Sequence, residues 1–260
     1  MKKRSNLSVL VCAMTVMAVI PLVSVCSAAT VNVDFGDLGG LYSGQGALAA
    51  SGDSWNAGLV SDGTATNLLD SLGNPTAVGY TLSGISGHGN TNEGGEFVST
   101  ASLLGDFIRG LDNDATSHLD LLITGLVPNN PYNIVLYGLQ NTTFGAFLVD
   151  NRGSTFTVDG VQKVSTGTDV GLSDTFVEGQ THVTYLNVLA DDLGQIDIDV
   201  DPFLQAGEDP QYTVAFLNGL QIEGEFAVPE PSSAFCMAIA GFGMLVFRCQ
   251  IRSSRCSRED

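Results

Sequence analysis

Apolar and polar residues alternate in short stretches through the middle of the chain. Such alternation predicts β-strands, because successive side chains of a strand point to opposite faces of a sheet. The first stretch of this kind follows an apolar N-terminal segment, and the last precedes a proline-containing tail. The predicted strands are Val31–Phe35, Val78–Leu82, Leu119–Thr124, Tyr132–Leu139, Phe144–Val149, Ser154–Val158, Val161–Ser165, His182–Leu189, Gln195–Val200, Tyr212–Leu217 and Leu220–Glu223.

Segments rich in Gly, Pro, Asn and Asp separate these strands and predict turns. Gly125–Pro131 and Asp191–Gly194 are of this kind. Asp159–Gly160 predicts a two-residue hairpin, because both central positions of such a turn need a positive φ. Gly36–Asn56 and Ser83–Gly95 are thick with Gly and polar residues, and we expect long surface loops there.

One segment, Thr100–Gly110, has a helical pattern. Leu103, Leu104, Phe107 and Ile108 would share one helix face, and the final glycine would end the helix. The chain lacks the strand–helix–strand alternation of a parallel sheet. The sequence therefore predicts an all-β fold, an antiparallel jelly-roll-like β-sandwich with one short helix.

The N-terminal segment has the three parts of a secretory signal peptide. A basic start, Met1–Arg4, is followed by the apolar stretch Leu7–Val25 and by the small residues Ser27–Ala29. We expect residues 1–29 to form a signal helix that signal peptidase removes, so that the mature chain begins near Thr30.

The C-terminal segment, residues 228–260, also consists of three parts that follow one another along the sequence. A proline motif occupies residues 228–233, and a run of 14 residues without charge, Ala234–Phe247, follows it. Scattered arginines then occupy residues 248–260. A membrane span needs about 20 apolar residues, and positive flanks stay on the cytoplasmic side. The pattern predicts a short transmembrane helix with the globular part outside.

This tail resembles the PEP-CTERM sorting signal of Gram-negative and related bacteria, which is also labelled an ice-binding protein C-terminal domain. The resemblance implies recognition by a membrane-embedded exosortase, processing near the prolines, and delivery to the cell surface or matrix. The alternatives are a plain membrane anchor and an amphipathic helix docked on the domain. The residues that carry the resemblance are the sorting motif Val228, Pro229, Glu230 and Pro231 and the basic stop Arg248, Arg252 and Arg255.

Charge and cysteine usage separate residues 30–227 from both ends. This interval holds 25 of the 28 Asp and Glu but only three of the ten Lys and Arg, so its net charge is about −22. Such a surface repels phosphate backbones and excludes nucleic acid as a partner. All five cysteines lie outside the interval, which therefore has neither a disulfide nor a thiolate metal site. Lipidation of Cys26 is disfavoured, because Val25 stands where a lipoprotein signal needs a small residue.

Three acidic residues share one face of a predicted strand. Asp197, Asp199 and Asp201 alternate with apolar residues, and together with Glu208 they give the outline of an EF-hand calcium loop. Pro202 stands where that loop needs Gly, so an EF-hand is disfavoured. Another kind of calcium site and a solvated strand face that discourages edge pairing remain as interpretations. No other cofactor is indicated.

The two predicted loops carry candidate ligand residues. Tyr42, Trp55 and His88 could gather on one rim and stack an aromatic ring on a sugar. The alternative is that Trp55 closes the end of the core. Gly84–His88 falls one residue short of a hydrolase nucleophile elbow, and nothing singles out a pair of catalytic carboxylates.

The sequence thus predicts an exported, non-catalytic surface or matrix protein, anchored transiently in the membrane. Alternatives are a carbohydrate-binding module that tethers exopolysaccharide and a polysaccharide-active enzyme.

Overall fold

The computed structural model describes residues 27–36, 41–48, 54–90, 103–110, 118–140, 152–167, 176–203 and 214–227. Within these ranges the regular secondary structure consists of strands, and no helix that could cross a membrane occurs there. The strands are β1 Ser27–Asp34, β2 Asn56–Ala57, β3 Gly63–Ala65, β4 Gly79–Ser83, β5 Ile85–Asn90, β6 Asp106–Gly110, β7 Leu119–Thr124, β8 Pro131–Tyr137, β9 Leu139–Gln140, β10 Arg152–Val158, β11 Val161–Ser165, β12 His182–Leu189, β13 Ile196–Pro202, β14 Phe216–Leu217 and β15 Gly219–Phe226.

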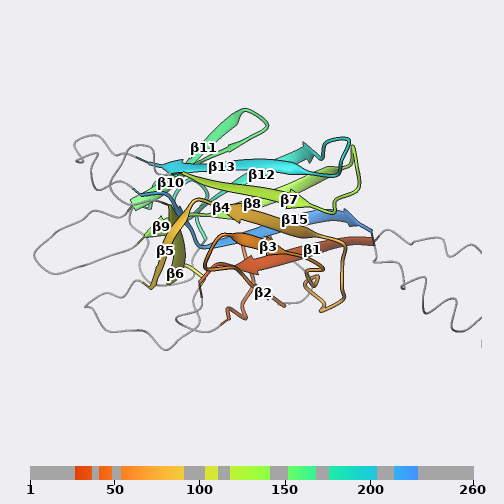
Figure 1. Ribbon diagram of the computed structural model, residues 1–260, viewed down its shortest axis with the longest axis horizontal. Coiled ribbons are helices and arrows are strands. Elements are labelled where there is room, and N and C mark those ends of the chain that lie inside the picture. Colours follow the sequence, from red (N-terminus) through yellow and green to blue (C-terminus); the bar gives the residue numbers. More distant parts are fainter. Residues whose placement is uncertain are drawn as a thin grey trace, which may run out of the picture.

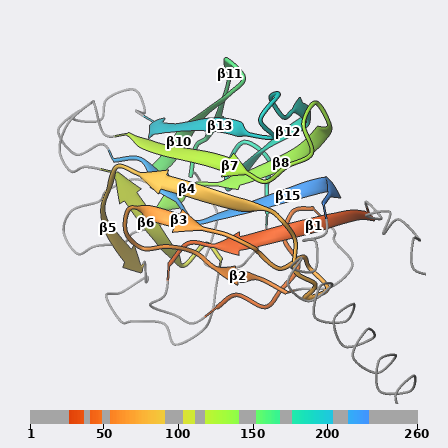
Figure 2. The same ribbon diagram turned by 45° about the vertical axis from the view of Figure 1, so that its right-hand side comes forward.

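Two large sheets pack face to face and confirm the predicted all-β sandwich (Figures 1 and 2). One has the strand order β12-β8-β15-β1-β2, and the other has the order β11-β10-β13-β7-β4-β3, with β9 paired to β10. Every pairing between these strands is antiparallel except that of β1 with β2. Fully buried side chains from both sheets, such as Ile134 and Ile222 from one and Leu121 and Ile198 from the other, fill the space between them. Burial of this apolar surface is the main force that holds the sheets together.

Most of the predicted strands and turns agree with the structure. The predicted bounds of β7, β11 and β12 are those observed. Asp159 and Gly160 have φ values of 50° and 72°, as the predicted two-residue hairpin requires. The predicted strand Phe144–Val149 and both terminal helices lie outside the described residues.

The predicted helix over Thr100–Gly110 was wrong within the described part. Leu103 to Gly105 form a turn, and the following residues form β6, which lies between β5 and β14 in a three-stranded sheet. Phe107 packs edge-to-face on Phe216 with ring centroids 5.1 Å apart, whereas Ile108 joins the main core. Neighbouring apolar residues thus point to opposite sides, which a strand permits and a helix face does not.

The predicted loop Ser83–Gly95 was also wrong in its first part, because residues 85–90 form β5. This segment is rich in polar residues and glycine, yet its backbone pairs with β6 from Ile85↔Gly110 to Asn90↔Asp106. The ladder with β6 satisfies backbone groups that a loop would leave to solvent.

A segment of loop covers the outer face of the five-stranded sheet. Gln221 lies in the middle of that face, where its Nε2 donates to Asn32 Oδ1 at 2.9 Å and its Oε1 accepts from Tyr137 Oη at 2.5 Å. The same Oε1 accepts from the backbone amide of Leu48 at 3.0 Å, so the loop is bonded directly to the sheet. Around Gln221 the five-stranded sheet is therefore buried on both faces.

The first and last strands lie side by side in the five-stranded sheet. β1 pairs with β15 along its whole length, from Ser27↔Phe226 to Asp34↔Gly219. The start of β1 and the end of β15 therefore lie at one end of the sandwich, on the right in Figure 1. We call this the terminal end.

Candidate functional site

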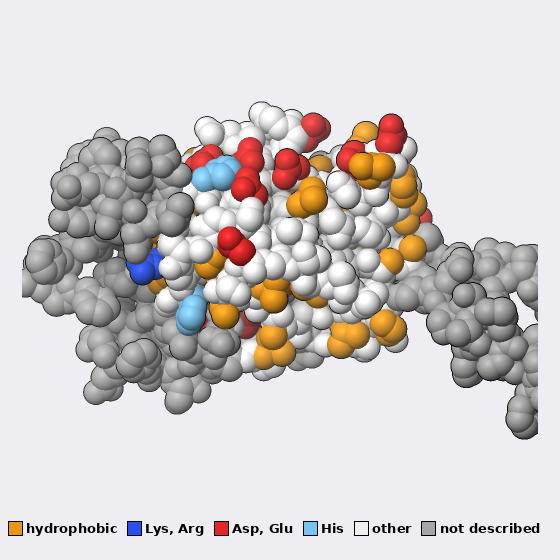
Figure 3. Space-filling model, in the orientation of Figure 1, with side chains coloured by type: hydrophobic (Ala, Val, Ile, Leu, Met, Phe, Trp, Pro, Cys, Tyr) orange, Lys and Arg blue, Asp and Glu red, His pale blue; other side chains and the backbone are white. Residues whose placement is uncertain are grey.

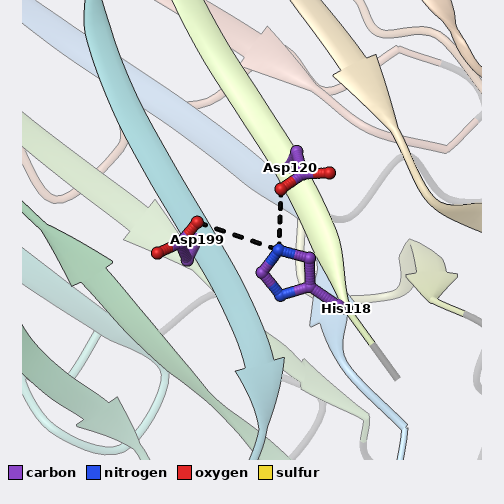
Figure 4. Close-up of side chains that lie close together, drawn as sticks. All are labelled: His118, Asp120 and Asp199. Atoms are coloured by element: carbon purple, nitrogen blue, oxygen red, sulfur yellow. Dashed lines mark hydrogen bonds and ion pairs between the residues drawn. The ribbon is translucent and has the colours of Figure 1, made fainter. Parts of the chain in front are cut away.

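A histidine surrounded by carboxylates lies on the outer face of the seven-stranded sheet. β7 and β13 are antiparallel, with Asp120 opposite Asp199, and His118 immediately precedes β7. Residues of each strand alternate between core and surface, so Leu119 and Val200 point inward. The polar neighbours consequently meet on the outside of the sheet (Figures 3 and 4).

Both ring nitrogens of His118 face carboxylate oxygens. Nδ1 lies 2.9 Å from Asp201 Oδ1, and Nε2 lies 2.7 Å from Asp120 Oδ1 and 3.8 Å from Asp199 Oδ1. Ser83, from β4, donates from its hydroxyl to the other oxygen of Asp120 at 3.0 Å. We call these five residues the His118 cluster. An imidazolium that donates from both nitrogens fits this arrangement, because carboxylates only accept hydrogen bonds.

The electrostatics of the His118 cluster favour the protonated imidazole. Partial burial alone would lower the pKa of His118, but the hydrogen bonds and charges of Asp201 and Asp120 outweigh it and raise the pKa above 6.5. Burial, together with the neighbouring carboxylates, raises the pKa of Asp199, although the charge of His118 opposes this. The imidazolium thus joins acids on two strands that would otherwise repel one another.

Three of these side chains also have the composition of a metal site. His118, Asp120 and Asp199 offer one nitrogen and two oxygen atoms within 4.8 Å of one another. A nitrogen ligand suits a first-row divalent metal better than calcium, which prefers oxygen alone. Binding would require loss of the Nε2 proton that the surrounding acids stabilise, so the cluster as it stands is a cross-strand ion-pair network.

The predicted calcium triad is arranged differently from a calcium cage. Asp197, Asp199 and Asp201 do lie on the outer face of β13, as the alternation predicted. Side chains two apart on a strand are separated by roughly 6.6 Å, and those four apart by roughly 13 Å. The strand therefore does not bring the three carboxylates around one ion, and two of them face His118 instead.

The predicted sugar platform is not assembled on the surface. Tyr42 and Trp55 are 7% and 5% exposed and pack edge-to-face with ring centroids 5.1 Å apart. They join a cluster with Leu103 and Tyr137 on the outer face of the five-stranded sheet, and Trp55 donates from its ring to Gly44 O at 2.8 Å. His88 is exposed on β5, in a different sheet. The aromatic rings are thus buried, but on the outer face of a sheet and not at the end of the core, where the alternative placed Trp55.

The sorting motif and the basic stop, residues 228–231 and the arginines from 248 on, lie outside the described residues. Within the described part, sequence reasoning missed His118, Asp120 and Ser83. The signal that could have found them is the outward position of Asp120 in a correctly predicted strand. Which strand pairs with it is not encoded locally, so the pairing partner Asp199 could not be assigned.

The comparisons with known proteins are sparse. No protein-family model and no curated protein matches the sequence. Among solved structures, the ANXUR2 extracellular domain from Arabidopsis thaliana matches with 16% identity and a TM-score of 0.40, over 76% of this chain and 49% of that one. The ANX2 ectodomain from the same plant matches with 17% identity and a TM-score of 0.35, over 57% and 44%. The chain thus spans less than half the length of either ectodomain.

Proposed function

We propose that this chain is an exported bacterial surface or extracellular-matrix protein, in which a non-catalytic sandwich of jelly-roll type is delivered by a PEP-CTERM signal. The observation that carries the proposal is the order of the tail. The motif Val228–Pro231, the apolar run and the arginines follow one another directly after β15, which ends at Phe226. A sorting enzyme needs its motif free of the folded domain, and the motif begins where the last strand has ended.

The N-terminal part of the chain fits the same proposal. The apolar part of the signal ends at Val25, and β1 begins at Ser27. Cleavage before Thr30 would keep Val31 and Val33, which are fully buried in the core. The expected mature chain therefore retains the part of β1 that the sandwich needs.

The partners in this proposal are signal peptidase, an exosortase-type enzyme and, during transit, the membrane around Ala234–Phe247. In the matrix, an exopolysaccharide is the remaining candidate for a binding partner of the sandwich. Burial of Tyr42 and Trp55 gives no support to sugar stacking at those residues. The acidic domain suits a soluble extracellular protein and disfavours nucleic acid.

Intact mass and cell fractionation test the proposal in cells with and without the sorting enzyme. We expect a mature form that starts near Thr30 and ends near Glu230, and we expect the C-terminal truncation to disappear without the enzyme. Replacing Pro229, Glu230 and Pro231 by Ala should have the same effect. Glu223→Ala is the matched control, because this exposed acid lies just upstream on β15. A mature form that ends at Asp260 in both strains would reduce the tail to an ordinary membrane anchor.

A further inference from the structure

Exposed leucines lie at the terminal end of the sandwich. Of the seven large hydrophobic side chains exposed in the described part, three lie at this end, two of them in turns and one at the last residue of β12. Hydrophobic side chains are frequent there in Figure 3, on the right. These residues, which we call the leucine end, are Leu72, Leu189 and Leu193.

The strand pairings place these leucines in two groups. Leu189 pairs with Pro131 at the start of β8, and Leu193 lies in the turn that follows β12. Leu72 lies in a turn bonded to the start of β1, because the amide of Ser71 donates to Thr30 O at 2.7 Å. The sheet order β12-β8-β15-β1 sets β15 between the two groups. The chain therefore leaves the sandwich with leucines on either side.

The length of chain beyond β15 limits how far this end can be from a membrane. The last described residue is Ala227, whose carbonyl accepts from the amide of Ala77 at 3.1 Å. Only residues 228–233 separate it from the apolar run that starts at Ala234. Six extended residues reach at most about 20 Å. If the apolar run lies in the bilayer, the leucine end stays within roughly this reach of the lipid headgroups.

We infer that the leucine end contacts the membrane surface while the tail is intact, with neutral lipid as its partner. This rests on the proposed function, which places the tail in the bilayer. Leu72 and Leu193 are 66% and 75% exposed, so each can insert an apolar side chain without disturbing the core. Asp191 and Asp192 adjoin Leu193, whereas Lys163, one of the three Lys and Arg in the described part, is bonded to Thr184 O farther back along β12. The contact is therefore apolar and should weaken on anionic lipid.

Tryptophan fluorescence of the full chain in vesicles tests the contact. Leu72→Trp and Leu193→Trp would report on the leucine end, and Leu41→Trp is the matched control. Leu41 is 46% exposed but lies beyond the opposite end of β1, where the amide of Tyr42 donates to Asp34 Oδ2 at 2.8 Å. The native Trp55 is 5% exposed and supplies a constant background. Unchanged unfolding midpoints would show that the variants fold.

Phosphatidylcholine with brominated acyl chains should quench the new tryptophans at 72 and 193 and leave the one at 41 bright. Replacing half of this lipid by phosphatidylglycerol should reduce the quenching. If alkaline carbonate releases the chain from vesicles, the tail is no anchor, and the proposed function and the contact fall together. If the chain is retained but the tryptophans at 72 and 193 stay unquenched, the contact alone is overturned. Shielding that depends on protein concentration instead of lipid would assign the leucine end to a second copy and overturn the inference.

Discussion

His118 and His182 respond to pH in opposite directions. Burial lowers the pKa of His182, with the charge of Glu178 acting the other way, whereas the acids around His118 raise its pKa. A raised pKa adds stability that is complete below the unfolded value of about 6.5 and is lost as pH rises through the folded value. A lowered histidine pKa costs stability as pH falls below about 6.5. The two residues therefore place the stability optimum between their folded pKa values.

Replacing His118 by Gln should remove the decrease in stability that the wild type shows as pH rises above about 6.5. The side chains of His118 and Asp120 are 38% and 55% exposed, so solvent screens their interaction, and we expect a loss of about 0.2–1 kcal/mol at pH 5.5. The loss should shrink as pH rises, because wild-type His118 then also becomes neutral. Urea unfolding of both proteins from pH 5.5 to 8.5 measures it, and His88→Gln on β5 is the control. A loss that stays constant over this range would contradict the imidazolium assignment.

Asn218 is a second residue whose environment gives a sharp expectation. It is fully buried between β14 and β15, where its Nδ2 donates to Asp106 O and its Oδ1 accepts from the amide of Leu139, both at 2.7 Å. Asn218→Ala would leave two buried backbone groups unsatisfied, and each costs about 1–3 kcal/mol. Denaturant unfolding should show this loss. Asn133→Ala, which removes exposed hydrogen bonds to Glu223 (2.9 Å) and from the amide of Asn187 (3.1 Å), should change stability far less.

At the scale of elements, two glycines with nearly the same φ allow backbone strain to be distinguished from steric crowding. Gly125 and Gly160 have φ values of 73° and 72°. A Cβ on Gly125 would lie 1.9 Å from Ala77 O, whereas a Cβ on Gly160 would have nothing within 4 Å. Gly160→Ala should cost about 1–2 kcal/mol, the penalty for a left-handed residue. Gly125→Ala should cost distinctly more, because β7 and the segment before β4 must separate. Equal unfolding midpoints for the two variants would refute the crowding argument.

Elements were predictable from sequence where local pattern and tertiary packing agree. β7 and the Asp159–Gly160 hairpin carry alternation and turn chemistry that need no distant partner. The prediction of a helix over Thr100–Gly110 failed because apolar spacing alone does not distinguish a helix face from a strand that is buried on both sides. The prediction for residues 85–90 failed because β5 is stabilised by pairing with β6, and its polar sequence gives no local sign of that pairing. The His118 cluster was half predictable: the acids of β13 were visible, but their neighbours on β7 depend on strand order.

At the scale of the whole molecule, the first and last strands of the chain pair with each other and hold the sandwich together. β1 lies inside the five-stranded sheet with β15 on one side, and Gln221 is hydrogen-bonded to Asn32 across 189 residues of sequence. The five-stranded sheet therefore lacks an inner strand until β15 is present. Contacts of such high sequence separation make folding slow. If the chain is exported as proposed, the sandwich is completed only after nearly all of it has crossed the membrane.

The same geometry predicts that the chain tolerates circular permutation. Ser27 and Phe226 are directly paired, and paired Cα atoms of an antiparallel ladder are about 5 Å apart, so a few glycines can join the ends. A permutant with joined ends that opens between Asp159 and Gly160 breaks only an exposed hairpin. It should unfold cooperatively within about 2 kcal/mol of the parent, because loop closure changes little.

A permutant with the same joint that opens between Ile134 and Val135 interrupts β8, where both side chains are fully buried, and it should fail to fold. If both permutants fold equally well, β8 is less central than its place beside β15 and β12 implies. If neither folds, the joint itself is at fault, and the two ends are farther apart in solution than their pairing requires.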